Sequence, residues 1–211
     1  KVVEETPSPA LSDELRLEIA NAAIDVARAA DYYGAGTVEF MLDENQKFYF
    51  LEMNTRLQVE HPITEMITGI DLVRAQIRVA EGNPLETAVT TASTSGHAIE
   101  ARLYAEEPRH EFLPTTGTLH RFQLLGDETE DMLSTVRVDT GFEDGSDVSI
   151  HYDPMLAKVI VHAPTRHEAA QRLALVLERM VIAGIVTNRD FLVATLRSPE
   201  FLAGDTHTDF I

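Results

Sequence analysis

Two runs of strand-like residues, separated by a short polar segment, constrain the fold of this chain more than any other feature. The runs are GTVEFML at residues 36–42 and KFYFLEM at residues 47–53, and the polar segment between them is DENQ. Aromatic and β-branched residues favour strands, and a short polar connection between two strands is typical of a β-hairpin. The sequence therefore predicts a hairpin over residues 36–53.

Polar residues then recur at every second position, at Glu52, Asn54, Arg56, Gln58 and Glu60. Side chains two residues apart leave the same face of a strand, so this row predicts one polar strand face. Such a face is either solvated, as in many antiparallel sheets, or part of a binding site. Residues elsewhere in the chain have to decide between these alternatives.

Glu39 on the first strand bears on this choice. A hairpin loop of two or four residues would make Glu39 and Glu52 neighbours on one face, whereas a three-residue loop would separate them. Facing carboxylates repel each other unless a cation compensates them. Mg²⁺ takes oxygen ligands, commonly from one or two carboxylates, and Asn54 adds a further oxygen. The spacing alone also allows two separately solvated carboxylates.

Other kinds of site find little support. The chain has no cysteine, which removes disulfides, thiol nucleophiles and thiolate metal sites. Its histidines are scattered, and VEHP at residues 59–62 lacks the second histidine of a zinc-binding helix. GAG at residues 34–36 lacks the lysine of a phosphate-binding loop, so we interpret it as a turn. No Gly-x-Ser-x-Gly segment is present.

The charge of the chain argues against nucleic acid and an anionic membrane as partners. Its 35 acidic and 17 basic residues give a net charge of −18, so a polyanionic ligand needs a local group of Arg, Lys or metal. No apolar run approaches the roughly 18 residues of a membrane helix, and we expect a soluble protein. The chain shows no leader and opens on Lys1, which is consistent with a piece of a longer protein.

Helical periodicity dominates the first part of the chain. Apolar residues from Leu15 to Ala30 follow the spacing of one helical face, with Ser12 as N-cap and Gly34 or Gly36 as the end. A second helix is predicted from Asp71 to Gly82.

Short strands dominate from about residue 95, in the segments GHAIEARLYAE, GTLHRFQLL, TVRVDTG and SIHYDPMLAKVIVHA. We therefore predict two domains, residues 1–94 and 95–211. A helix with a capping box of Thr165 and Glu168, ending at Gly184, follows the strands, and a last helix begins near Asn188.

Four blocks of the sequence resemble consecutive blocks of the biotin carboxylase family, in the ATP-grasp superfamily. They are GAGTVEFML, FYFLEMNTRLQVEHPITEMITGIDLVRAQIRVAEGNPL, GHAIEARLYAEEP and HYDPMLAKVIVHAPTR. EMNTRLQVEHP is the most selective, because carbamoyl-phosphate synthetases share its Glu-x-Asn element but not the Gln-Val-Glu-His that follows. The close resemblance is to the carboxylase subunits of acetyl-, propionyl- or methylcrotonyl-CoA carboxylases.

The resemblance implies an α+β chain. Residues 1–94 would be the C-terminal part of an ATP-grasp fold, with the metal, ATP and bicarbonate site, and residues 95–211 the β-rich biotin carboxylase C-terminal domain.

The resemblance also implies roles for residues of the hairpin. Glu39, Glu52 and Asn54 match the ligands of the Mg²⁺ or Mn²⁺ ion that bridges the phosphates of ATP. Met41 and Leu51 match positions that line the adenine pocket, although both would also suit a plain hydrophobic core.

Further roles follow for the residues after the hairpin. Arg56, Gln58, Val59 and Glu60 match the residues around bicarbonate, with Glu60 as the general base and Val59 contributing its backbone amide. A guanidinium fork suits a planar anion with two oxygens.

Arg102 matches the arginine that stabilises the enolate of biotin as N1 attacks CO₂. Its alternative is a salt bridge to Glu100 on an exposed strand face. Asp153 and Lys158 also fall in a matching block, and we expect structural roles for them.

The activity implied by the resemblance is ATP- and bicarbonate-dependent carboxylation of biotin on a carrier protein through carboxyphosphate. Its implied partners are a biotin carboxyl carrier protein or domain, a carboxyltransferase subunit and a second copy in a homodimer or larger complex. The family pattern starts upstream of Lys1, so we expect this chain alone to be nearly inactive. The expected compartment is a bacterial cytoplasm, ahead of a mitochondrial matrix.

Two alternatives stay open at this point. One is another ATP-grasp carboxylase or ligase, such as a urea or pyruvate carboxylase. The other is a non-catalytic module whose polar strand face binds a partner. The sequence does not name the acyl-CoA that is finally carboxylated.

Overall fold

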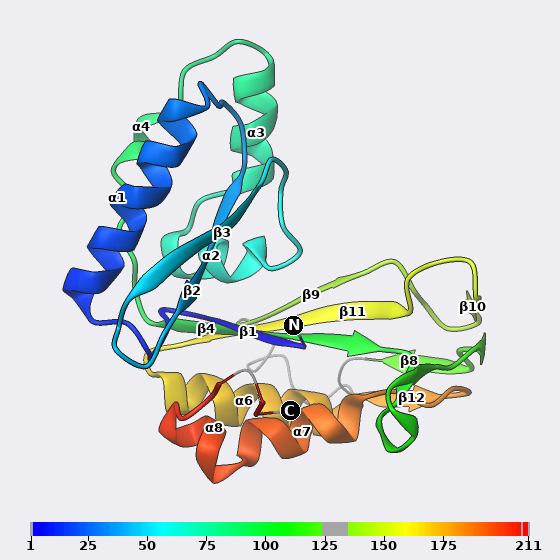
Figure 1. Ribbon diagram of the computed structural model, residues 1–211. Coiled ribbons are helices and arrows are strands. Elements are labelled where there is room, and N and C mark those ends of the chain that lie inside the picture. Colours follow the sequence, from blue (N-terminus) through cyan, green and yellow to red (C-terminus); the bar gives the residue numbers. More distant parts are fainter. Residues whose placement is uncertain (1, 124–134, 208, 211) are drawn as a thin grey trace. The chain divides into compact units, whose positions relative to one another are not determined.

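The computed structural model describes residues 2–123, 135–207, 209 and 210, and the chain forms two units. The hairpin unit is Pro7–Thr94, and the sheet unit combines Lys1–Thr6 with Ser95–Ile211. Each unit mixes helices and strands, so the predicted α+β class is confirmed (Figure 1). Among the described residues, no helix has both the length and the apolar character that a membrane crossing requires.

The hairpin unit consists of α1 (Asp13–Ala29), β2 (Thr37–Leu42), β3 (Phe48–Asn54), α2 (His61–Thr68), α3 (Leu72–Ala80) and α4 (Thr87–Thr90). The predicted hairpin is present as β2 and β3. Ser12 is the predicted N-cap of α1, and its hydroxyl accepts a hydrogen bond from the Leu15 amide. Asp71 caps α3 in the same way.

A β-bulge sets the register of the hairpin. The loop has five residues, 43–47, and an odd loop by itself would leave Glu39 and Glu52 on opposite faces. The register shifts by one residue between Glu39 and Phe40, where Leu51 is the extra residue on β3. Glu39 therefore lies directly opposite Glu52. The pairing that an even loop would have given is thus present, but the bulge produces it.

Two expectations for this unit are wrong. α1 ends at Ala29, well before Gly34, because Asp31 takes the left-handed conformation, with φ of 49°, that stops a helix. The period-two row is a strand only as far as Asn54. Residues 55–60 form a loop, and Pro62 sits in the first turn of α2, where the missing N–H is tolerated.

In the part of the sheet unit that the structure describes, helical segments and short strands surround one larger sheet. Its elements are β1 (Val3–Thr6), β4 (His97–Tyr104), β5 (Glu106–Glu107), η1 (Pro108–His110), β6 (Leu113–Pro114), β7 (Gly117–Thr118), β8 (Arg121–Gln123), β9 (Val136–Thr140), β10 (Asp147–Val148), β11 (Met155–Ala163), α6 (Arg166–Arg179), β12 (Val181–Ala183), α7 (Arg189–Arg197) and α8 (Pro199–Ala203).

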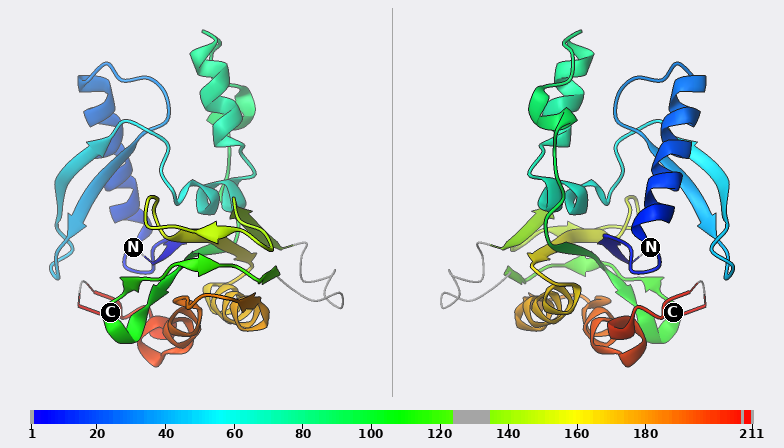
Figure 2. Two further views of the ribbon diagram at one scale, coloured as in Figure 1. Left: turned by 90° about the vertical axis from the view of Figure 1, so that its right-hand side faces the viewer. Right: turned by 90° about the vertical axis from the view of Figure 1, so that its left-hand side faces the viewer.

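The larger sheet has the antiparallel order β1-β4-β11-β9, and helices α6 and α7 cover one of its faces (Figures 1 and 2). Alternate residues of β4, among them Ile99 and Leu103, point into the core with Leu173 and Leu177 of α6. The residues between them, Glu100 and Arg102, leave the other face. β4 is nevertheless buried along nearly its whole length.

Several strand and helix boundaries differ from the sequence expectations. The predicted strand at 117–125 is present as β7 and β8, and Leu124 and Leu125 lie outside the described residues. The strand predicted from Ser149 begins only at Met155.

One of the two hydrogen bonds of the predicted capping box of α6 is present. The Thr165 hydroxyl accepts a hydrogen bond from the Glu168 backbone amide. Gly184, however, does not end this helix, because α6 stops at Arg179 and β12 follows. Gly184 has φ of 114°, and a Cβ there would lie 2.0 Å from the Thr118 carbonyl oxygen. Glycine is therefore needed at this position for backbone conformation and close approach.

Candidate functional site

Glu39, Glu52 and Asn54 form a cluster on the paired strands of the hairpin. The Asn54 amide Nδ2 donates to Glu39 Oε1 at 3.0 Å and to Glu52 Oε1 at 3.1 Å. Glu39 is half-buried and Glu52 is exposed. Two carboxylate oxygens therefore converge on a single point, which a group with positive polarity occupies.

A hard divalent cation fits the donor set of this cluster. Two carboxylates and one amide supply oxygen ligands of the kind that Mg²⁺ takes, with positions left for phosphate and water. An asparagine side chain offers an oxygen as well as an N–H₂ group, so Asn54 can also serve as a ligand. Among the described residues, no group of three or more His, Cys, Asp or Glu side chains has a metal-binding arrangement. Any metal here would thus rely on Asn54 and on a substrate.

The loop after β3 brings three of the predicted bicarbonate residues to one cavity. Arg56, Gln58 and Glu60 line a pocket of about 430 Å³ within the hairpin unit. Gly34, Gly36, Thr37 and His61 are among the other residues that line it. The polar residues at every second position were interpreted as one face of a strand. Arg56, Gln58 and Glu60 instead come together because the loop that carries them folds around a pocket.

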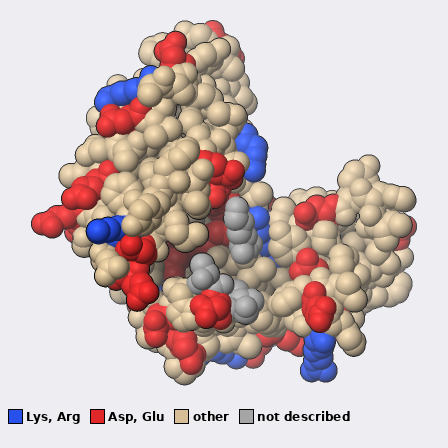
Figure 3. Space-filling model, in the orientation of Figure 1, with Lys and Arg blue, Asp and Glu red and all other residues tan. Residues whose placement is uncertain are grey.

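Arg56 connects the pocket to the carboxylate cluster. Its Nη1 donates to Gln58 Oε1 at 3.2 Å, and its Nη2 donates to Asn54 Oδ1 at 3.4 Å. Acidic groups outnumber basic ones on the face of the molecule in Figure 3, and the net charge of the chain is −18. Arg56 is one of only 17 basic residues in this acidic chain. An anion bound here would rely on local charge and hydrogen bonds rather than on the overall field.

Gln58 has an unsatisfied donor beside this guanidinium. Its side chain is only 9% exposed, and its Nε2 is buried without a hydrogen-bond partner among the described residues. A buried N–H group without an acceptor costs about 1–3 kcal/mol. An oxygen of a ligand in the pocket would satisfy this donor.

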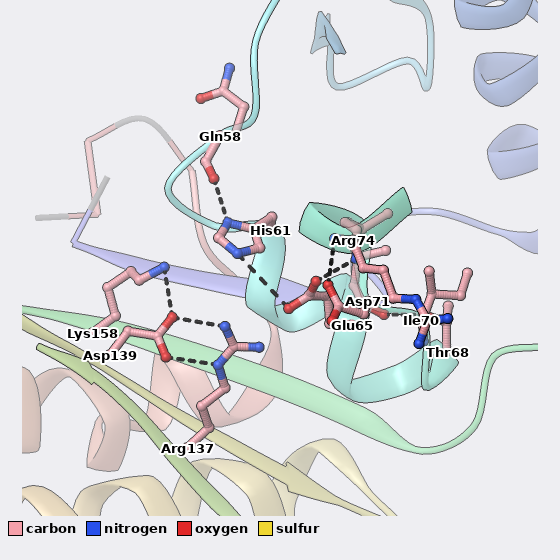
Figure 4. A network of polar contacts seen from close by, with 12 residues as sticks. Gln58, His61, Glu65, Thr68, Ile70, Asp71, Arg74, Arg137, Asp139 and Lys158 are labelled. Atoms are coloured by element: carbon pink, nitrogen blue, oxygen red, sulfur yellow. Dashed lines mark hydrogen bonds and ion pairs between the residues drawn. The ribbon is translucent and has the colours of Figure 1, made fainter. Parts of the chain in front are cut away.

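The loop is anchored at the start of α2. The Nδ1–H of His61 donates to the Gln58 carbonyl at 2.8 Å, and its Nε2 lies 3.9 Å from Glu65 Oε2 (Figure 4). Glu65 Oε1 accepts from the Leu72 amide at 2.6 Å. Glu60 is the N-cap residue of α2, so its carboxylate lies at the positive end of the helix dipole. Val59 lies between Gln58 and Glu60 in this loop.

Met41 and Leu51 lie on the hairpin and are not core residues of this unit. Their exposed fractions are 45% and 51%, and the neighbouring Tyr49 and Phe50 are each 53% exposed. The alternative that both are plain core residues is therefore wrong for the described chain. Their position on an exposed apolar strand surface is compatible with contact to a flat apolar group.

Arg102 belongs to the sheet unit, on strand β4. Its Nη2 lies 2.5 Å from Glu4 Oε1 on β1, and the two side chains are 10% and 15% exposed. The strand face that carries Arg102 is buried, so the predicted alternative of an exposed strand face is wrong. Burial opposes the charge of the guanidinium, but the Glu4 carboxylate and hydrogen bonds with Tyr104 and Glu4 outweigh it and raise the pKa of Arg102.

Lys158 and Asp153 were expected to have structural roles. Lys158 lies directly across from Arg102 in the pairing of β4 with β11, and its Nζ binds Asp139 Oδ2 at 3.1 Å. Asp153 Oδ1 accepts from the Met155 amide at 2.9 Å and so shapes the start of β11.

Sequence reasoning missed Glu4 and His61. Glu4 is 98 positions away from Arg102 in the chain, and only the β1–β4 pairing brings the two together. His61 had a local signal, since it follows Glu60 directly and precedes the proline of a helix start.

Comparisons with known proteins match both parts of the chain. Residues 100–211 match the family described as biotin carboxylase C-terminal domain, and residues 1–88 match the ATP-binding domain of the carbamoyl-phosphate synthase L chain. Over its whole length the chain is 47% identical to the mitochondrial methylcrotonoyl-CoA carboxylase subunit alpha of Mus musculus and 46% identical to biotin carboxylase 2 of Bacillus subtilis.

A solved structure gives the same result. The biotin carboxylase domain dimer of Hydrogenobacter thermophilus 2-oxoglutarate carboxylase, in complex with MgADP and bicarbonate, superposes with a TM-score of 0.92 at 38% identity. All of this chain and 45% of that chain are covered. The chain spans 29% of the mouse subunit and 46% of the Bacillus enzyme.

Proposed function

This chain belongs to the biotin carboxylase family, and we propose that it takes part in the ATP- and bicarbonate-dependent carboxylation of biotin on a carrier protein. The observation that carries this proposal is the convergence of Arg56, Gln58 and Glu60 on one cavity. Arg56 also bonds to Asn54 of the carboxylate cluster, which links an anion pocket to a candidate metal site.

Glu39, Glu52 and Asn54 would hold the Mg²⁺ or Mn²⁺ ion of a nucleotide. The ion supplies positive charge that neutralises the phosphate oxygens during transfer. Met41 and Leu51 would contact the adenine ring from the exposed surface of the hairpin. MgADP in the Hydrogenobacter complex supports a nucleotide site in this part of the family.

Bicarbonate would bind in the pocket. The Arg56 fork faces a planar anion, the unsatisfied Gln58 amide donates to one of its oxygens, and the Val59 backbone N–H donates to another. Glu60 accepts the bicarbonate proton. The deprotonated oxygen then attacks the γ-phosphorus of ATP, the bond to the β-phosphate oxygen breaks, and carboxyphosphate and ADP result.

Carboxyphosphate would then break into CO₂ and phosphate, and N1 of biotin would attack the CO₂ carbon. Negative charge develops on the ureido oxygen of biotin as N1 gives its proton to the phosphate that carboxyphosphate has released. A fixed guanidinium stabilises such an oxyanion, and this is the role that we assign to Arg102.

The relatives help to define what this chain contributes. They are named for different acceptors, methylcrotonoyl-CoA in one case and 2-oxoglutarate in another, so what they share is the carboxylation of biotin. A biotin carrier protein or domain, a carboxyltransferase and a second biotin carboxylase copy are the partners that we propose. A mitochondrial relative is 47% identical and a bacterial one 46% identical, which leaves both compartments as hypotheses.

A chimera tests this function. Residues 1–211 would replace the matching segment of Bacillus subtilis biotin carboxylase 2, and phosphate release from ATP would be measured with and without bicarbonate and free biotin. We expect release that requires bicarbonate and increases with biotin. Glu60→Gln should lower the rate about 10²–10⁴-fold, since it removes the base.

Glu44→Gln is the control, because Glu44 is an exposed carboxylate in the hairpin loop. The rate of this variant should stay within about twofold of the parent chimera, since surface substitutions are usually nearly neutral. ATP cleavage that ignores both bicarbonate and biotin would contradict the proposal and favour a different ATP-grasp ligase.

A further inference from the structure

Arg102 is held by a side chain from the opposite end of the sequence. Glu4 on β1 lies across from Glu100 on β4, and the Arg102 amide donates to the Val2 carbonyl at 2.9 Å. This pairing places Glu4 Oε1 2.5 Å from Arg102 Nη2. The ion pair therefore depends on β1 being the edge strand beside β4.

Arg102 also has a cation as its direct neighbour. Lys158 on β11 lies opposite Arg102, and like charges directly opposite each other on paired strands are destabilising. Lys158 is paired with Asp139 on β9, whose carboxylate also accepts from Arg137 at 2.8 and 2.9 Å (Figure 4). Lys158 thus pairs with Asp139 on the flanking strand β9, and Arg102 pairs with Glu4 on the flanking strand β1.

An arginine side chain has many rotamers, and a group that stabilises a developing oxyanion has to be in place before the charge appears. An ion pair with a carboxylate at 2.5 Å limits the orientations that the guanidinium can take. The negative charge of Glu4 also weakens the electrostatic field of Arg102. Glu4 therefore helps to position the guanidinium but reduces its electrostatic effect on an oxyanion. Tyr104, two residues along the strand, adds a hydrogen bond to Arg102.

We propose that Glu4 is a positioning residue for biotin carboxylation, which orients Arg102 toward the ureido oxygen of biotin. This inference rests on the proposed function. It assigns a specific role to the strand at residues 3–6.

The neighbouring Glu5 shows that β1 does not need Glu4 as an anchor. Glu5 Oε2 accepts from His97 Nε2 at 2.8 Å and from Arg166 Nε at 2.6 Å, and its Oε1 accepts from Arg166 Nη2 at 2.9 Å. These contacts and the backbone pairing already fix the strand in the sheet. Glu5 is therefore a matched control, because it is the same residue type on the same strand. Its partners His97 and Arg166 have no role in the proposed reaction.

The test uses the chimera with Glu4→Gln, Glu4→Asp and Glu5→Gln. Two rates are compared in each protein: bicarbonate-dependent ATP cleavage without biotin, and carboxylation of free biotin. Glu4→Gln should lower kcat for biotin carboxylation about 10- to 100-fold, much more than it lowers ATP cleavage, since small misplacements of a reacting group cost up to about 10²-fold. Glu4→Asp should recover part of this loss.

Two further readouts separate positioning from folding. Glu5→Gln should lower the melting temperature but keep the ratio of the two rates. In an Arg102→Ala background, Glu4→Gln should have no additional effect on carboxylation, because a positioning residue acts only through its partner.

A parallel fall of both rates in Glu4→Gln, an unchanged carboxylation rate, or full additivity with Arg102→Ala would each overturn the inference. A parent chimera whose ATP cleavage does not respond to biotin would instead overturn the proposed function, and the inference with it.

Discussion

In the hairpin unit, the carboxylates of Glu39 and Glu52 lie on strands that are partly or fully exposed, whereas in the sheet unit Glu100 and Arg102 are buried on a central strand. The apolar residues follow the same contrast. Tyr49 and Phe50 are about half exposed on the hairpin, while Ile99 and Leu103 are completely buried in the sheet.

The comparison teaches where each kind of chemistry can be placed. Under the proposed function, the groups that take up ions and small anions lie on an accessible hairpin and loop. The charge proposed to act on biotin lies in a close-packed unit, where it is paired with a carboxylate. The following predictions are designed to break or sharpen this contrast.

The largest expected effect is on the stability of the sheet unit. Leu173 of α6 is fully buried in its core, and Leu173→Ala should lower the free energy of unfolding by about 2–5 kcal/mol. Leu17 on α1 is 63% exposed, and Leu17→Ala should change the free energy of unfolding by no more than about 0.5 kcal/mol. Urea denaturation of the 211-residue chain measures both. An equal cost for the two changes would contradict the contrast in packing.

Loss of one carboxylate in the hairpin unit should affect catalysis rather than folding. Glu52→Gln should lower ATP cleavage by the chimera about 10²–10³-fold at fixed Mg²⁺, since it removes a preorganised charge from the phosphate site. Added Mg²⁺ should recover part of the rate, and removal of Mg²⁺ with a chelator should abolish it in the parent.

Glu44→Gln in the exposed hairpin loop is the control for this change, and it should alter neither the rate nor the Mg²⁺ dependence. If Glu52→Gln leaves the Mg²⁺ dependence unchanged, the carboxylate pair is a solvated strand face and not a metal site.

The buried ion pairs of the sheet unit predict a pH dependence of stability. Burial raises the pKa of Glu5, but hydrogen bonds from His97 and Arg166 and their charges outweigh it and hold the pKa below its ordinary value of 4.5. The ionised carboxylate therefore contributes stability at pH values above 4.5, and this contribution is lost as the pH falls through the lowered pKa.

Glu5→Gln should accordingly destabilise the protein by about 1–3 kcal/mol at neutral pH, because it removes the partner of a charged group. The difference from the parent protein should shrink below pH 4.5. Melting temperatures of both proteins from pH 7 to pH 3 measure it, and a constant difference across that range would show that the charge of Glu5 is not what stabilises β1.

Helix caps give the smallest and most local test. Ser12→Ala removes the cap of α1 and Thr165→Ala the cap of α6, and each should cost about 1 kcal/mol. Hydrogen exchange should speed up in the hairpin unit for the first change and in the sheet unit for the second. Equal acceleration in both units from either change would show that they open as one cooperative body.

Local patterns in the sequence determined much of this protein. The hairpin and the Ser12 and Thr165 caps follow from periodicity and capping residues that act within a few positions. The α+β class was implied by the resemblance to the family. The family follows from EMNTRLQVEHP and the blocks around it. The pairing of Glu39 with Glu52 was one of two alternatives, since an even loop would give it and an odd loop would not.

Only the tertiary structure decided how distant or irregular segments come together. The bulge at Leu51 compensates for the odd length of the five-residue loop and so places Glu39 opposite Glu52. No local preference in the sequence predicts such a compensation. The loop at residues 55–60 gathers Arg56, Gln58 and Glu60 around a cavity although their spacing is that of a strand. Glu4 meets Arg102 because β1 pairs with a strand more than 90 residues later. Contacts of this kind arise from packing between segments, which a pattern of neighbouring residues does not record.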